Sequence, residues 1–158
     1  MKNESIKKIS DLLNQKLNLL CQYRDISKAY DKIDVESLAV FLTNREPIIN
    51  EIIKINNEIK LISQVLEPDV KEKMLAVLAF EKIAVDENDE IYPIYLTCNS
   101  IYNTLLDSMK IEDNIKQSVT IYREKLVSQI AEINKSSKIL EYNNNIKRTI
   151  GVYLDERK

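Results

Sequence analysis

Residues 38–66 read LAVFLTNREPIINEIIKINNEIKLISQVL. Apolar side chains recur in this stretch at alternating steps of three and four residues, and Arg45 is the one interruption. This spacing places an apolar stripe on a single face of a long helix, which is the pattern of a packed helix seam. The residues of the stripe are Leu38, Phe41, Ile48, Ile52, Ile55, Ile59, Ile62 and Leu66. The stretch therefore predicts an all-α fold.

An earlier stretch repeats the pattern, with Lys16 as its one polar interruption. Its apolar residues are Ile9, Leu12, Leu19, Tyr23, Ile26, Tyr30 and Ile33. The two stripes bury one another if the two helices pair side by side in opposite directions. We therefore expect an elongated antiparallel helical bundle with coiled-coil-like seams, which begins with a helical hairpin over residues 1–66.

The remaining chain predicts shorter helices over residues 68–109, a long last helix over 113–148 and a tail over 149–158. One domain is expected for residues 1–158, because this length suits a single core. The tail carries apolar residues, which predict either docking onto the bundle or contact with a partner.

Three local signals refine the helix boundaries. Asp34 is expected to cap the second helix, and Pro68 suits the first turn of the third. Pro47 removes a backbone hydrogen bond inside the second helix and predicts a kink or a break near residues 43–46. The asparagines at 143–145 are weak helix formers and predict fraying.

The composition argues against an enzyme. The chain has no histidine and one glycine, so it lacks the usual general base, the commonest zinc ligand and the glycine-rich loops that cradle phosphates. The acidic run at residues 86–90 resembles a calcium loop, but Ile91 and Thr97 stand where that loop needs glycine and glutamate. We therefore expect no catalytic residues, no metal site and no cofactor.

Charge and cysteine content bear on partners and location. The net charge is −2 with both signs mixed, which argues against nucleic acid as the main partner. Cys21 and Cys98 lie in helical patterns and are interpreted as core thiols in a reducing compartment. The start, MKNESIKKIS, lacks the apolar run of a signal peptide, and no stretch has the ~20 apolar residues of a membrane span. A cytoplasmic location without a membrane span is expected.

Tyrosines gather in the second half of the sequence, at Tyr92, Tyr95, Tyr102 and Tyr122. Tyrosine combines apolar area with a polar tip, so it suits a binding surface as well as the end of a bundle. Both interpretations stay open.

The chain resembles flagellar export chaperones of the FlgN/FliT type over nearly its whole length. The resemblance rests on DLLNQKL at 11–17, LTNREPIINEI at 42–52, Tyr92-Pro93 followed by residues 105–106 and 112–114, and the ending YLDERK at 153–158. Pro47 departs from the family's second helix, where a helix former is usual, and the loop before the closing motif is shortened.

The resemblance implies a cytoplasmic chaperone that binds helical terminal segments of hook–filament junction proteins and delivers them to a component of the export apparatus. A helical segment needs an apolar groove, and the last helix is the least enclosed by later chain. The predicted partner-binding residues are Ile130, Ile133, Leu140, Tyr142, Ile146 and Tyr153. The alternative is a structural or adaptor coiled coil, without catalytic activity, that forms a homodimer through the seam of residues 38–66.

Overall fold

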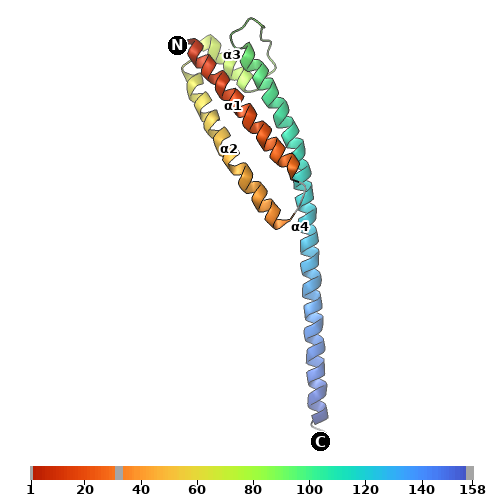
Figure 1. Cartoon of the computed structure of the whole chain (residues 1–158). Helices are drawn as coiled ribbons and strands as arrows, with labels where there is room; N and C mark the ends of the chain where they lie inside the picture. The colour runs from red at the N-terminus through yellow and green to blue at the C-terminus, as the bar shows by residue number, and fades with distance from the viewer. Residues whose placement is uncertain (1, 31–33, 156–158) are drawn as a thin grey trace. The chain divides into compact units, whose positions relative to one another are not determined.

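The structure is a computed structural model that describes residues 2–30 and 34–155, and the side chains of residues 3–30 and 34–148. The described residues form helices and no strand, which confirms the all-α prediction. The helices are α1 (Lys2–Ala29), α2 (Val35–Gln64), α3 (Pro68–Leu78) and α4 (Tyr92–Asp155) (Figure 1). Contacts divide the chain into an N-terminal unit, Met1–Lys116, and a C-terminal unit, Gln117–Lys158.

The helices α1 and α2 form the predicted antiparallel pair of the N-terminal unit (Figure 1). The ring of Tyr30, just after α1, stacks on Phe41 with 4.2 Å between centroids, near the start of α2. At the opposite end of the pair, Lys8 Nζ lies 2.6 Å from Glu58 Oε1. The predicted cap is also confirmed, because Asp34 Oδ1 accepts a hydrogen bond from the Ser37 amide at 2.7 Å.

The first part of α4 packs along α1 in the same direction. Thr97 Oγ1 lies 3.4 Å from Asn14 Oδ1, and farther along both helices the Tyr23 hydroxyl donates to Glu112 Oε1 at 3.0 Å. All the helices of the N-terminal unit contribute to one core, and the described residues of both predicted stripes face inward. Ile33, the last residue of the second stripe, lies outside the described residues. The buried members of the core include Ile9, Leu13, Ile55, Ile59, Met74, Val77, Ile94, Cys98 and Ile101.

The break predicted at Pro47 is wrong, because α2 continues through this residue. Pro47 and Thr43 both lie on the exposed side of α2, where water can take the place of the lost backbone hydrogen bond. Arg45 on the opposite side is buried against α1. Tertiary packing therefore holds the helix together across the proline.

The predicted start of a separate last helix at residue 113 is also wrong. One helix, α4, covers the predicted fourth and last helices, the asparagines at 143–145 and the tail as far as Asp155. No glycine or proline interrupts residues 94–150, and Glu112, just before the predicted start, forms an ion pair with Arg45. Whether the tail docks or binds a partner lies outside the described side chains.

Candidate functional site

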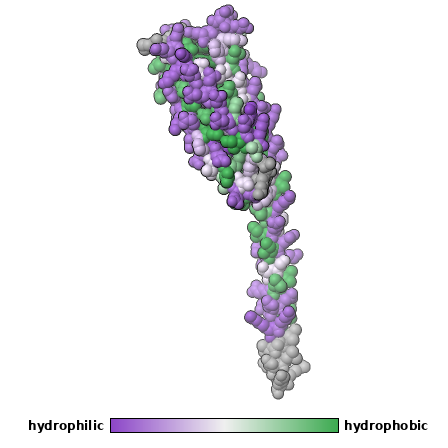
Figure 2. Space-filling view, viewed as in Figure 1, coloured by the Kyte–Doolittle hydropathy of each residue, from purple (hydrophilic) through white to green (hydrophobic). Residues whose placement is uncertain are grey.

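The predicted partner-binding residues lie on the part of α4 that belongs to the C-terminal unit. This unit is one helix, and none of its described side chains, at residues 117–148, is buried. The exposed fractions are 64% for Ile133 and 63% for Leu140, and Ile130, Tyr142 and Ile146 are exposed as well. Figure 2 shows hydrophobic residues at the surface of this part of α4. The side chain of Tyr153 lies outside the described residues.

Helix geometry separates these residues onto two faces. At about 100° per residue, Val119, Tyr122, Leu126, Ile130, Ile133 and Leu140 share a face roughly 80° wide, which we call the apolar stripe. Tyr142 projects about 180° from Ile133, and Ile146 about 140° from it. A single helix presents a stripe and has no groove of its own, so the expected groove is not formed within this unit.

A buried polar cluster lies in the N-terminal unit, around the residue that interrupts the first stripe. Arg45 Nη2 lies 2.6 Å from Glu112 Oε1, and the Arg45 guanidinium carbon lies 4.2 Å from the ring centroid of Tyr23 and 4.5 Å from that of Phe41. The Ser27 hydroxyl is 3.5 Å from the same carboxylate oxygen. The cluster connects side chains of α1, α2 and α4. Its ion pair and the contacts of the guanidinium with the two rings therefore hold these helices together.

The tyrosines do not form one surface. Tyr92 and Tyr95 stack on each other with ring centroids 6.1 Å apart, and the ring centroids of Tyr102 and Phe80 are 5.4 Å apart. Tyr122 belongs to the C-terminal unit, on the apolar stripe. The rings of the N-terminal unit therefore pack locally, each against a nearby aromatic ring.

The acidic loop before α4 is organised by hydrogen bonds. Asp86 Oδ1 accepts from the Asn88 amide at 2.8 Å, and Asp89 pairs with Lys73 of α3. Among the described residues, no group of three histidine, cysteine, aspartate or glutamate side chains has an arrangement suited to a metal ion. No described helix contains an apolar stretch of the length that a membrane crossing needs.

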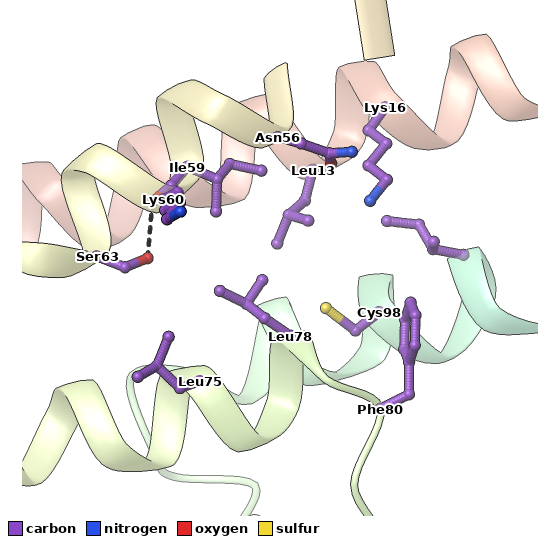
Figure 3. Close-up of a pocket in the computed structure, with 11 residues that line it drawn as sticks. Leu13, Lys16, Asn56, Ile59, Lys60, Ser63, Leu75, Leu78, Phe80 and Cys98 are labelled. Carbon is purple, nitrogen blue, oxygen red and sulfur yellow. Dashed lines mark hydrogen bonds between the residues drawn. The ribbon is translucent and has the colours of Figure 1, made fainter. Parts of the chain in front are cut away.

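A pocket of about 190 Å³ lies in the N-terminal unit, between side chains of α1, α2, α4 and the end of α3 (Figure 3). Its walls are mostly apolar, and Lys16 and Lys60 are its charged residues. In Figure 3 the Lys16 side chain points toward the pocket, across from Cys98 and the ring of Phe80. The residues that line it are Leu13, Lys16, Asn56, Ile59, Lys60, Ser63, Leu75, Leu78, Phe80, Cys98 and Ile101.

Two ionisable groups that line this pocket, Lys16 and Cys98, have shifted pKa values. Burial lowers the pKa of Lys16, although the nearby Cys98 opposes the change. Burial also affects Cys98, whose pKa it raises to about 11, although the Lys16 ammonium opposes this increase. The thiol is therefore protonated and unreactive at neutral pH. The sequence pattern marked Lys16 only as an interruption of an apolar stripe, and the pocket itself was not predicted.

Comparison with known proteins gives no relative from which a function can be transferred. No protein-family model, curated protein or solved structure matches the sequence. The exposed stripe of α4 and the pocket of the N-terminal unit therefore carry the functional argument.

Proposed function

We propose that this chain is a binding protein of the chaperone type, which holds a helical segment of another protein on the apolar stripe of residues 117–148. The observation that carries the proposal is that no side chain of the stripe is buried, and that Ile130, Ile133 and Leu140 are exposed. Large apolar side chains repeat along one helical face, and no second element of the C-terminal unit covers them. Contiguous apolar surface of this kind marks interaction sites in soluble proteins.

Helix pairing explains why a helical partner suits the stripe. Val119, Leu126, Ile133 and Leu140 recur every seven residues, the spacing at which two helices stay in contact along their length. A long helix without tertiary contacts is only marginally stable in water, so a bound helix would stabilise both partners. The stripe and its partner would then bury apolar area together.

The identity of the partner rests on the resemblance to flagellar export chaperones. On that basis, the bound segments are helical ends of hook–filament junction proteins, and a component of the export apparatus receives them. The proposal needs no nucleotide, metal or catalytic residue, because binding alone keeps an aggregation-prone segment soluble. It places the protein in the cytoplasm, where such segments are made.

The test measures peptide binding and folding in parallel. Fluorescence anisotropy follows labelled peptides from the termini of the junction proteins of the same host, and circular dichroism follows thermal unfolding. Ile133→Asp and Leu140→Asp should weaken binding by about tenfold or more, because each places an unpaired carboxylate against apolar peptide surface. The thermal midpoint should stay unchanged, since both residues are exposed.

Ala131→Asp is the matched control. Ala131 is exposed on the same helix and lies about 160° from Ile133, so the same charge enters the opposite face. Unchanged peptide affinity is expected for this variant. Equal losses in all the variants would show a nonspecific effect of charge, and no binding to any junction protein would remove the flagellar assignment.

A structural or adaptor coiled coil is the second candidate, and the seven-residue repeat of the stripe favours it. The seam of residues 38–66 cannot serve it in this structure, because Phe41, Ile55 and Ile59 are buried within the chain. A homodimer would instead pair two copies of the apolar stripe. Sedimentation equilibrium of the unmodified protein and of Ile133→Asp tests this candidate, which requires a dimer that the substitution dissociates.

A further inference from the structure

The pocket of the N-terminal unit holds a charge that the fold does not neutralise. Among the described residues, no carboxylate forms an ion pair or a hydrogen bond with Lys16. Two acidic side chains of α2 are engaged elsewhere, since Glu58 pairs with Lys8 and Glu51 with Lys54. A half-buried ammonium without a counter-charge is costly, and a bound anion would offset that cost.

The polar groups around Lys16 are suited to an anion. Lys60 and Asn56 lie on the exposed side of α2 and line the same pocket, where an ammonium and an amide can both donate hydrogen bonds. The Ser63 hydroxyl donates a hydrogen bond to the Ile59 carbonyl oxygen, with 2.7 Å between the two oxygen atoms (Figure 3). The described residues that line the pocket include no aspartate or glutamate that would repel a carboxylate.

One wall of the pocket is formed by a residue in an unfavourable backbone conformation. Phe80 has a φ of 58°, in the left-handed region that glycine normally occupies after a helix. The amide of Phe80 bonds to Val77 O at 3.1 Å, and that of Glu81 to Ala76 O at 3.0 Å, which closes the end of α3. A phenylalanine here costs free energy that glycine would not, and its ring contributes a pocket wall and contacts Tyr102.

We propose that this pocket binds a small amphiphilic carboxylate, with its apolar body among Leu13, Phe80 and Ile101 and its carboxylate beside Lys16. A cavity of 150 Å³ is known to hold benzene, so about 190 Å³ suits an apolar body of roughly six to eight carbon atoms. The apolar walls provide affinity and the ammonium selects the negative charge. This site lies within the N-terminal unit and is independent of the apolar stripe.

Benzoate is the probe and benzyl alcohol is its neutral counterpart of similar size. Nitrogen-15 NMR spectra of the full chain are recorded while either compound is added. Saturable shifts are expected at the amides of Lys16, Ser63, Phe80 and Cys98, with a dissociation constant for benzoate below about 5 mM. Absence of saturation up to about 20 mM, or shifts spread evenly over the chain, would overturn the proposal.

Lys16→Met removes the charge and keeps the length of the side chain. Benzoate should bind at least about tenfold more weakly, while binding of benzyl alcohol should not weaken. Lys28→Met, on the exposed side of the same helix, is the matched control and should leave both affinities unchanged. Equal benzoate affinity in the unmodified protein and Lys16→Met would refute the role of the ammonium.

A filling variant tests the cavity without removing a charge. Leu75 lines the pocket and is 48% exposed, so Leu75→Trp can add volume there with little disturbance of the core. Binding of both probes should be lost in this variant while the helical circular dichroism signal is retained. If Leu75→Trp folds and still binds benzoate like the unmodified protein, the ligand occupies another place and the proposal fails.

Discussion

Apolar residues recur at helical spacing in both parts of α4, but they belong to a buried core in the first part only. Between Tyr92 and Lys116, Ile94, Cys98 and Ile101 are at most 2% exposed and belong to the core. From Gln117 to Arg148, no described side chain is buried. Apolar spacing thus predicts that a segment is helical and which face is apolar, but the rest of the chain decides whether that face is covered.

Paired truncations of isoleucine test this contrast most directly. Ile94→Ala should lower the free energy of unfolding by about 3 kcal/mol, because it leaves a cavity in a packed core. Ile133→Ala makes the same change on the same helix and should alter stability by less than about 0.5 kcal/mol. Urea unfolding followed by circular dichroism measures both. A comparable loss for Ile133→Ala would mean that the stripe is covered in solution.

The polar cluster of Arg45 gives the next largest effect. Arg45→Ala should destabilise the protein by about 2–3 kcal/mol, because it removes the ion pair and the contacts with two rings. The expected loss is smaller than for fully buried ion pairs, because the Glu112 side chain is 36% exposed. The measurement is urea unfolding of Arg45→Ala, Glu112→Gln and the double variant.

The double variant separates the ion pair from the stacking of the rings. If the pair is energetically coupled, the double variant should be more stable than the sum of the single losses predicts, by about 1 kcal/mol or more. Additive losses would assign the effect of Arg45 to its contacts with the rings. A loss below about 1 kcal/mol for Arg45→Ala would show that this cluster does not anchor α4.

The sequence predicted those features that depend on nearby residues. The helical seam of residues 38–66, the Asp34 cap and the start of α3 at Pro68 follow from local spacing and from capping chemistry, and the structure contains all of them. Arg45 was read as an interruption because its partner Glu112 lies on another helix, far along the chain. Local spacing likewise gave no sign of this contact when it predicted a separate last helix from residue 113.

The candidate sites were less predictable than the helices. Ile133 and Leu140 are exposed on the apolar stripe, whereas Tyr142 and Ile146 are exposed on other faces of the helix. Order along the chain placed these residues in one predicted surface, but rotation around the helix separates them. The pocket depends on Lys16, Cys98 and Phe80, which come from different elements. The periodicity of one segment does not show which side chains from different elements lie together in the fold.

The stability of the core depends on pH through the thiol of Cys98. The unfolded chain should release the thiol proton near the ordinary pKa of 9.0, whereas burial in the folded protein raises the pKa to about 11. The stability that this group contributes is therefore present below pH 9 and is lost as the pH rises toward 11, by at most about 3 kcal/mol. Urea unfolding between pH 8 and 11 measures it.

Cys98→Ala isolates this contribution from that of Lys16. The lowered pKa of Lys16 acts in the opposite direction, because the unfolded chain holds this proton more tightly than the folded protein does. This effect makes stability rise with pH above the lowered pKa, until the unfolded lysine also deprotonates near pH 10.5. The unmodified protein should therefore lose more stability than Cys98→Ala over the same pH range. Parallel pH profiles for the two proteins would contradict a buried, protonated thiol.

Pro47 tests how far packing replaces backbone hydrogen bonding in the N-terminal unit. Pro47→Ala restores the amide that can bond to the Thr43 carbonyl and raises helix propensity, but it also gives the unfolded chain more freedom. These effects oppose one another, so stability should be unchanged or should rise by up to about 1 kcal/mol. A loss of more than about 1 kcal/mol would show that the native backbone requires proline at this position.

The converse substitution belongs in the C-terminal unit. Ala131→Pro places a proline where no second element of the unit packs against the helix, so nothing there compensates for the lost hydrogen bond and the clash with the preceding turn. The far-ultraviolet helical signal should fall, while the unfolding midpoint of the core stays unchanged. The helix of α2 tolerates its proline because contacts with α1 hold it in place. If Ala131→Pro leaves the helical signal intact, the second part of α4 has stabilising contacts as well, and the contrast between the two parts of this helix disappears.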